Sequence, residues 1–200
     1  PLSCAKDCGM NRAEISLAEY RQQNDTAFLN KIRQQFGNVY ILPEGGSNSL
    51  AIKGCAEIVE EISDELENPF DIICCASGTG ATLAGLISAI SPSQTAIGFS
   101  ALKGGDFLNH EVETFLQGKN TEAVTKNWHI ESDFHFGCYA KINDELIQFM
   151  SEFQSQYGFA LDAVYTGKMF YGLFERIKAK AFKPGTTIIA IHSGGLQGNK

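Results

Sequence analysis

The sequence predicts a three-layer α/β fold, in which a mostly parallel sheet lies between flanking helices. Short apolar runs rich in β-branched residues predict strands, and segments with apolar residues three or four positions apart predict amphipathic helices. These two patterns alternate along the chain, which is typical of parallel strands joined by crossover helices. Glycine-rich turns at 45–46 and 78–80 separate strand from helix, as expected for tight connections in such a fold.

The predicted elements divide the chain into two lobes. Strands are expected at residues 39–42, 70–76, 95–99 and 186–191, and helices at residues 27–36, 51–66, 82–90, 106–116, 144–157 and 167–181. The Gly-Gly-Ser-Asn stretch at 45–48 predicts a joint between a first lobe, 1–44, and a larger second lobe, 45–200. The first lobe is too small to bury a core alone, so we expect further sequence to complete it.

Composition narrows the classes of function. The 200 residues carry a formal net charge of −7 at pH 7, which argues against nucleic-acid binding because such surfaces cluster Lys and Arg. No apolar run reaches the roughly 18 residues of a membrane span. The chain starts without Met and without the layout of a signal peptide, which suggests that it begins inside a longer one.

The six cysteines show no metal-site or redox-motif spacing. Neither C-x-x-C nor H-E-x-x-H occurs, so no metal site is expected. Cys74 and Cys75 are neighbours in a predicted strand, so their side chains point to opposite faces of the sheet. We expect both to be buried and reduced, as in a cytoplasmic protein. A redox role for Cys4 and Cys8 is the alternative use of cysteine here.

The most informative stretch is FDIICCASGTGATLAGL, residues 70–86. A buried strand leads into the loop 77–80, and a helix begins near Ala81. Glycines bring backbone N–H groups close to a ligand, and the helix end adds positive charge, so the turn can bind an anion. The hydroxyls of Ser77, Thr79 and Thr82 add hydrogen-bonding capacity. This chemistry suits a phosphate, and a purely structural strand–helix turn is the alternative.

Nucleotide motifs do not fit this loop. A P-loop needs a Lys directly after its glycines, and none follows here. The dinucleotide fingerprint needs a third glycine, where position 83 is Leu. It also needs an acid at the end of the next strand, where the chain has Gly98-Phe99-Ser100.

Three further clusters accompany the loop. A second glycine turn lies at 40–48, the stretch 164–168 opens a helix, and 191–195 follows the last predicted strand. Ligands collect at the carboxyl ends of parallel strands, so we expect loops 77–82 and 193–195 to share one pocket.

Four stretches in order resemble the aminocyclopropane-carboxylate deaminase / D-cysteine desulfhydrase family: ILPEGGSNSLAIKGCAEI, ASGTGATLAGL, AVYTGKMFYGL and IHSGGLQGN. The resemblance runs from about residue 9 to the end. This family is a branch of the pyridoxal-phosphate enzymes that share the tryptophan synthase β-subunit fold, PLP fold type II. The resemblance implies that 1–44 ends the smaller domain and that 45–200 builds most of the larger, cofactor-binding domain.

The resemblance also implies which residues bind the cofactor, pyridoxal 5'-phosphate. The residues that match the phosphate cradle are Gly78, Thr79, Gly80, Ala81 and Thr82. Tyr165 and Tyr139 match active-site tyrosines near the substrate, and Ser193 matches a hydroxyl beside the pyridine nitrogen. Read without the resemblance, both tyrosines fit simple packing, and His192 fits a structural role in a strand.

Position 166 bears on the reaction. The deaminase subgroup has a glutamate there that stabilises a protonated pyridine, whereas this chain has Thr166. A neutral hydroxyl makes the cofactor a weaker electron sink than a carboxylate does. Expulsion of sulfide needs less electron withdrawal than opening of a cyclopropane ring. We therefore expect a desulfhydrase-like β-elimination that gives ammonia and a keto acid from a small amino acid. Ring-opening deamination is the alternative.

The family's catalytic lysine is expected outside this chain. Family members carry the cofactor on a lysine in a glycine–asparagine–lysine segment near the start of the full chain, and no such segment occurs here. Lys53 and Lys168 are the alternative candidates for this lysine within the chain. We expect the chain alone to lack lyase activity, and a catalytically dead phosphate-binding module is the competing interpretation. The family also implies a homodimer, and the net charge and the lack of a long apolar run predict no nucleic-acid or membrane partner.

Overall fold

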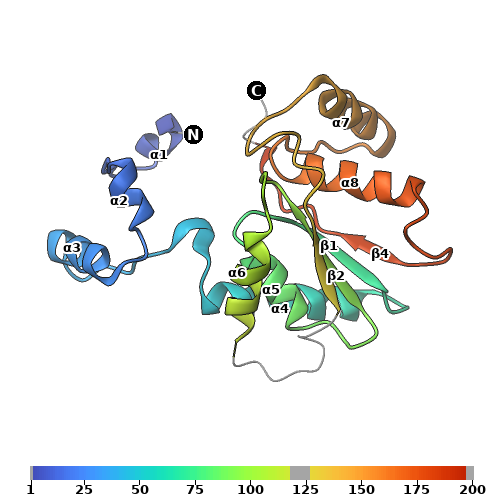
Figure 1. Cartoon of the computed structure of the whole chain (residues 1–200), viewed down its shortest axis with the longest axis horizontal. Coiled ribbons are helices and arrows are strands. Elements are labelled where there is room, and N and C mark those ends of the chain that lie inside the picture. The colour runs from blue at the N-terminus through green and yellow to red at the C-terminus, as the bar shows by residue number, and fades with distance from the viewer. Residues whose placement is uncertain (1, 118–126, 197–200) are drawn as a thin grey trace. The chain divides into compact units, whose positions relative to one another are not determined.

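The computed structural model describes residues 2–117 and 127–196, with side chains from residue 5 onward (Figure 1). The chain divides into two compact units, Pro1–Gly46 and Ser47–Lys200. Among the described residues no helix is long and apolar enough to cross a membrane.

The first unit consists of three helices and one turn of 3-10 helix. They are α1 (Leu2–Asp7), α2 (Leu17–Arg21), α3 (Thr26–Phe36) and η1 (Glu44–Gly46). Within this unit the Tyr20 hydroxyl and the Gln23 amide both donate hydrogen bonds to the Glu44 carboxylate, at 2.6 and 3.0 Å. No residue of α2, α3 or η1 is buried. The unit therefore has little core of its own, as expected for so short a lobe.

The predicted strand at residues 39–42 is wrong. The structure has no strand there, and Tyr40 and Leu42 are 71% and 68% exposed. A β-branched apolar run forms a strand only when a neighbouring strand satisfies its backbone groups. Among the described residues of this unit, no segment forms a strand.

The second unit is built on a four-stranded parallel sheet. Its strands are β1 (Ile72–Ser77), β2 (Thr95–Ser100), β3 (Trp128–Glu131) and β4 (Ile188–Ala190), in the order β3-β2-β1-β4. All pairs are parallel, and β1 aligns Ile72 with Thr95 of β2 and with Ile188 of β4. Because the strands are parallel, the loops that follow them all leave the same end of the sheet.

Helices cover both faces of the sheet. They are α4 (Ser49–Glu65), α5 (Ala81–Ile87), α6 (Phe107–Leu116), α7 (Asp144–Tyr157) and α8 (Thr166–Lys178). Figure 1 shows α4, α5 and α6 on one side of the strands and α7 and α8 on the other, in agreement with their contacts. The predicted three-layer α/β fold is confirmed.

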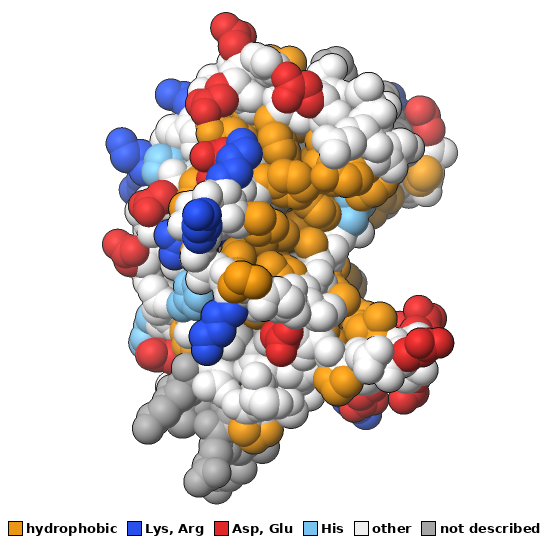
Figure 2. Space-filling view, turned by 90° about the vertical axis from the view of Figure 1, so that its right-hand side faces the viewer, with side chains coloured by type: hydrophobic (Ala, Val, Ile, Leu, Met, Phe, Trp, Pro, Cys, Tyr) orange, Lys and Arg blue, Asp and Glu red, His pale blue; other side chains and the backbone are white. Residues whose placement is uncertain are grey.

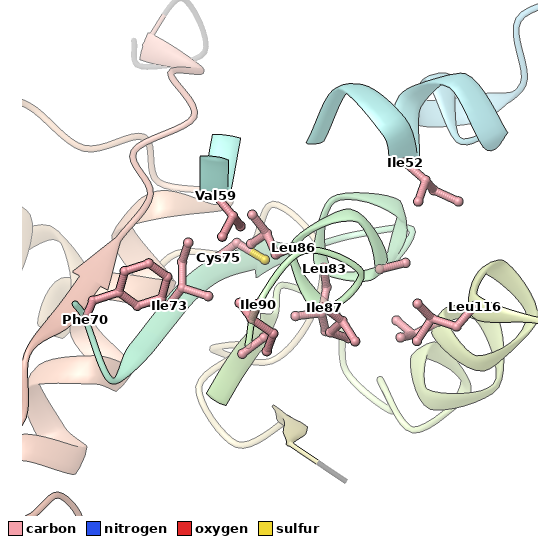
Figure 3. Close-up of a cluster of buried hydrophobic side chains, with 13 residues drawn as sticks. Ile52, Val59, Phe70, Ile73, Cys75, Leu83, Leu86, Ile87, Ile90 and Leu116 are labelled. Carbon is pink, nitrogen blue, oxygen red and sulfur yellow. The ribbon is translucent and has the colours of Figure 1, made fainter. Parts of the chain in front are cut away.

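Each face of the sheet has its own apolar core. On one face Val59 of α4, Cys75 of β1 and Leu86 of α5 point toward one another (Figure 3). On the other face Cys74 and Phe99 pack against α7 and α8. The two cores pack against opposite faces of the sheet and thereby hold the loops at its carboxyl end in place.

Helices α4 and α5 cross closely at a glycine. A Cβ on Gly85 would lie 2.4 Å from Cys55 Cβ and 2.8 Å from the Ile52 carbonyl oxygen, and both atoms belong to the rigid body of α4. We expect Gly85→Ala to lower the free energy of unfolding by about 3 kcal/mol, because the helices must separate. Urea unfolding measures this change.

Gly54 on α4 provides the matched control, since no atom lies within 4 Å of a Cβ placed there. Gly54→Ala improves helix propensity at an open position and should raise the free energy of unfolding by roughly 0.5–1 kcal/mol. Equal effects of the two substitutions would contradict the close crossing.

The adjacent cysteines lie on opposite faces, as predicted. Cys74 and Cys75 are 0% and 2% exposed and belong to different cores, and both are free thiols. Burial raises the pKa of Cys75 to about 12 and raises that of Cys74 as well. Cys8 is exposed. The side chain of Cys4 lies outside the described residues.

These raised pKa values predict a loss of stability at alkaline pH. Below the usual thiol pKa of 9.0 both thiols are protonated in the folded and the unfolded chain. Above it the unfolded chain releases protons that the folded chain retains, so the free energy of unfolding falls as pH rises from 9.0 toward about 12. Urea titrations across this range should give a shallower decline for the Cys74→Ala/Cys75→Ala variant. The same pH dependence of the free energy of unfolding in both proteins would contradict the raised pKa values of the two thiols.

Most other predicted elements are confirmed with small shifts at their ends. Helix α5 ends at Ile87, three residues before the predicted end. Strand β3 was missed because it has only four residues, two of them His129 and Glu131. Glu131 is tied by an ion pair of 2.9 Å to Arg176 of α8, a contact between distant parts of the sequence.

Apolar side chains form a broad band on the face of the molecule seen in Figure 2. A hollow of about 700 Å³ lies where α8 ends and β4 begins, lined by Ile177, Phe182, Pro184 and Ile188 among others. It lies at the amino end of the parallel strands, so it is separate from the loops described next.

Candidate functional site

The turn after β1 presents a row of backbone N–H groups. It connects Ser77, the last residue of β1, to Ala81, the first residue of α5. In the described part of the chain, the N–H groups of residues 78–82 donate to no protein acceptor. Gly80 has a φ of 85°, which an L side chain rarely adopts, and its Cβ would lie 3.0 Å from Val112 Cγ2. The turn therefore has the backbone donors that a phosphate cradle requires, and binding of a phosphate there stays a prediction.

The hydroxyls around the turn differ in their availability. Ser77 is 2% exposed and lies against Gly98, where an added Cβ would be 2.7 Å from Ser77 Oγ. It therefore faces the sheet rather than the turn. Thr79 and Thr82 are partly exposed.

Ser47 reaches the same turn and was missed as a site residue. Its hydroxyl donates to Thr79 Oγ1 at 2.6 Å. Asn48 follows it as the N-cap of α4, and its Oδ1 accepts from the N–H groups of Leu50 and Ala51, at 2.9 Å each. The sequence singled out the glycine turn at 40–48 as a lobe joint and as a companion of the loop at 77–82, but it gave Ser47 no role of its own.

Tyr165 lies directly over the turn. A Cβ on Gly78 would lie 3.1 Å from Tyr165 Cε1 and 3.4 Å from its hydroxyl oxygen. The Tyr165 hydroxyl donates to the Tyr139 hydroxyl at 3.5 Å, and the two rings meet edge to face with centroids 5.9 Å apart. The structure thus brings Tyr165 to the turn and Tyr139 to Tyr165, although the two tyrosines are 26 residues apart in sequence.

Asp162 fixes the start of the helix that follows Tyr165. This buried carboxylate accepts from the N–H groups of Val164, Tyr165 and Thr166 at 3.0, 2.7 and 2.8 Å. Three hydrogen bonds from one turn hold the backbone of Tyr165 in place. A Cβ on Gly195 would lie 3.0 Å from Asp162 Cγ, so the loop after β4 packs on the same carboxylate. Sequence reasoning did not single out Asp162.

Thr166 does not present its side chain to this site. It is fully buried, its hydroxyl donates to Asp162 Oδ2 at 2.6 Å, and its Oγ1 accepts from the Asp162 N–H at 2.9 Å. The role expected for Thr166 beside the cofactor ring finds no counterpart in this arrangement, because its proton is already used within the turn. Position 166 nevertheless lacks the carboxylate that the deaminase subgroup has there.

Ser193 lies in the loop after β4 and is exposed. The preceding His192 is only partly buried and lies beyond the strand. Its Nε2 is 2.8 Å from the Ala160 carbonyl oxygen, and its Nδ1 accepts from the Gly194 N–H at 3.2 Å. Both ring nitrogens are engaged with backbone, which is the structural role expected for this histidine.

The two lysines weighed as alternatives have different surroundings. Lys53 is exposed on α4. Lys168 is 1% exposed, and its ammonium donates to three backbone carbonyl groups, so no free amine faces the cradle from this position. Burial lowers the pKa of Lys168. Within the described ranges, no three His, Cys, Asp or Glu side chains gather as a metal site.

Relatives with known names match most of the chain. A putative 1-aminocyclopropane-1-carboxylate deaminase of Thermotoga maritima is 32% identical, covering 95% of this chain and 63% of its own length. A bifunctional D-cysteine desulfhydrase/1-aminocyclopropane-1-carboxylate deaminase of Arabidopsis thaliana is 31% identical, covering 95% and 51%. A D-cysteine desulfhydrase of Salmonella newport is 30% identical, covering 82% and 53%. The chain thus spans about half to three-fifths of these relatives.

The fold and the family agree with this likeness. The crystal structure of an ACC deaminase homologue superimposes with a TM-score of 0.78 at 26% identity, covering 98% of this chain and 62% of that one. The family described as "Pyridoxal-phosphate dependent enzyme" matches residues 7–194. Pyridoxal phosphate is the cofactor of this family, and its fold type II architecture is the one predicted. The chain belongs to the family of pyridoxal-phosphate dependent enzymes, as the four sequence stretches indicated.

Proposed function

We propose that this chain supplies the phosphate cradle and the tyrosine pair of a pyridoxal-phosphate dependent lyase for a small amino acid. The proposed reaction is a β-elimination like that of D-cysteine desulfhydrase, which releases sulfide, ammonia and a keto acid. One observation carries the proposal: the turn at residues 78–82, whose N–H groups have no protein acceptor, meets the Tyr165 ring at Gly78.

The cradle fits the cofactor's phosphate by its donors and its lack of side chains. A phosphate dianion needs several hydrogen bonds, and the turn offers the backbone N–H groups of Gly78, Thr79, Gly80, Ala81 and Thr82. At Gly78 a Cβ would lie 3.1 Å from Tyr165 Cε1, so a glycine there keeps the space between the turn and that ring clear. Ser47 donates to Thr79 Oγ1, which leaves the Thr79 hydroxyl proton free to donate outward.

The tyrosine pair supplies proton chemistry next to this cradle. Bound pyridoxal phosphate supplies the electron sink that stabilises negative charge at the amino acid's Cα. The Tyr165 hydroxyl, which faces Gly78 and the Tyr139 hydroxyl, is placed to hold or pass a proton at the substrate. Exposed Ser193, in the loop after β4, is the group we assign to the cofactor's ring nitrogen.

The side chain at position 166 supports elimination over ring opening. Threonine is neutral, so residue 166 offers the ring nitrogen no negative charge. Its hydroxyl is also already bonded to Asp162. Without that charge a protonated ring is less stable and draws electrons more weakly. Sulfide is a good leaving group and requires less withdrawal. Ring-opening deamination is the second candidate, because the Thermotoga maritima and Arabidopsis thaliana relatives carry that activity in their names.

The experiment that tests this function uses the protein expressed from its complete reading frame. We expect a yellow holoprotein that converts D-cysteine to equal amounts of sulfide and pyruvate. A higher kcat/KM for 1-aminocyclopropane-1-carboxylate would select the ring-opening candidate instead. A protein that binds pyridoxal phosphate without turning over either compound would be a binding module, and one that does not bind it would overturn the proposal.

The domain assignment, assembly and location belong to the same proposal. We assign residues 1–44 to the end of a smaller domain and 45–200 to the larger, cofactor-binding domain. The protein is proposed to be a cytoplasmic homodimer, and the buried free thiols of Cys74 and Cys75 suit a reducing compartment. Light scattering of the full-length protein and cell fractionation test these two points.

A further inference from the structure

Lys168 is the largest side chain that is fully buried in the described chain. Its ammonium donates to the carbonyl oxygens of His135 and Cys138 at 2.9 Å each and to that of Ala101 at 3.4 Å. A buried ammonium is costly unless it is fully hydrogen-bonded, so these contacts are strong constraints on the backbone that makes them. Two of the three lie in the segment 134–141 between β3 and α7, called here the Tyr139 loop.

The Tyr139 loop has a strained backbone. Phe136 and Ala140 both have a φ of 55°, and Gly137 between them has a φ of 104°. The first two are non-glycine residues in the left-handed region, a conformation that persists only where surrounding contacts enforce it. The loop therefore depends on anchors outside itself.

One face of α8 supplies those anchors. Tyr139 packs edge to face on Tyr165, and Phe136 packs edge to face on Tyr171 with ring centroids 4.8 Å apart. Lys168 lies midway between these two aromatic residues, at the three-residue spacing that shares a helix face. It binds the Cys138 carbonyl, immediately before Tyr139. Of these three anchors, Lys168 is the one whose charge meets backbone carbonyl groups of the loop.

We propose that Lys168 is a positioning residue, whose ammonium holds the strained Tyr139 loop so that the Tyr139 hydroxyl meets that of Tyr165. The catalytic consequence rests on the proposed function, whereas the effect on the loop does not. Lys168 acts through Tyr139 and does not itself touch the substrate.

The first test measures the loop itself by hydrogen exchange with mass spectrometry on the full-length protein without cofactor. We expect Lys168→Met to speed exchange in residues 134–141 by about tenfold or more, because the carbonyls lose their charged donor. Lys178→Met is the control on the same helix, since its ammonium is bonded to Glu175 at the surface. Unchanged exchange in the loop, or equal acceleration throughout β1 and α8, would overturn the proposal.

A second variant separates strain from general damage. Ala140→Gly removes the Cβ from a left-handed position, so Lys168→Met/Ala140→Gly should exchange more slowly in the loop than Lys168→Met alone. Lys168→Gln keeps two N–H donors and should give an intermediate rate, which serves if Lys168→Met does not fold. A glycine at 140 that gives no slowing would count against a loop held under strain.

The catalytic consequence is tested with a double-mutant cycle on kcat in the holoenzyme. Lys168→Met and Tyr139→Phe should each lower kcat more than they change KM. The kcat of the double variant should lie within about twofold of that of the less active single variant. Multiplying effects would mean that Lys168 does not act through Tyr139. A holoenzyme without activity would refute the proposed function, while the exchange result still decides the role of Lys168.

Discussion

Tyr165→Phe is expected to lower kcat of the full-length holoenzyme by roughly 10² to 10⁴-fold, with a much smaller change in KM. The substitution keeps the ring that covers Gly78 and removes only the hydroxyl, which lies within hydrogen-bonding distance of Tyr139. The expected loss is therefore one of proton transfer rather than of packing. Steady-state assays with D-cysteine measure it.

Tyr157→Phe is the matched control for this substitution. Tyr157 ends α7, is 45% exposed, and packs its ring on Phe153 and Phe174. Removing its hydroxyl should leave kcat within about twofold, the scatter of ordinary surface changes. If Tyr165→Phe behaves in the same way, Tyr165 only packs against the cradle, and the proton-transfer role fails.

Asp162→Ala is expected to lower the free energy of unfolding by about 3 kcal/mol. The substitution leaves the N–H groups of Val164, Tyr165 and Thr166 without their acceptor in a buried turn. Because the same carboxylate supports the backbone of Tyr165, kcat should fall as well. Urea unfolding and steady-state kinetics measure the two effects.

Asp106→Ala is the control at another helix start. Asp106 is the N-cap of α6, but its side chain makes no capping hydrogen bond and is exposed. We expect a change below about 0.5 kcal/mol there. A comparable loss at both positions would mean that the hydrogen bonds of Asp162 contribute little.

Local sequence patterns predicted the fold of the second unit well. The apolar run that becomes β1, the glycine turn and α5 were all expected, because periodicity and turn chemistry act within a few residues. The opposite burial of Cys74 and Cys75 followed from strand geometry alone. The segment 39–42 failed for the complementary reason, since a strand requires a partner that no local pattern reveals.

The site was predictable only as far as its motifs reach. The cradle and Tyr165 were named from sequence, and the structure places them in contact. Asp162 carries no local signal, because its role depends on which N–H groups the fold brings to it. Ser47 lies in a glycine turn that the sequence singled out, but its contact with Thr79 depends on the fold. Thr166 and Lys168 mislead for the same reason. Their side chains would be assigned to a ligand or to solvent, yet both are buried and bonded within the protein.

The central claim is that the turn at residues 78–82 holds the cofactor's phosphate with its backbone N–H groups. Amide NMR of the full-length protein, labelled with ¹⁵N-glycine and titrated with pyridoxal 5'-phosphate, tests it most directly. We predict that the resonances of Gly78 and Gly80 move strongly and that pyridoxal without its phosphate moves them far less. Equal shifts with both compounds, or shifts confined to other glycines, would contradict the account.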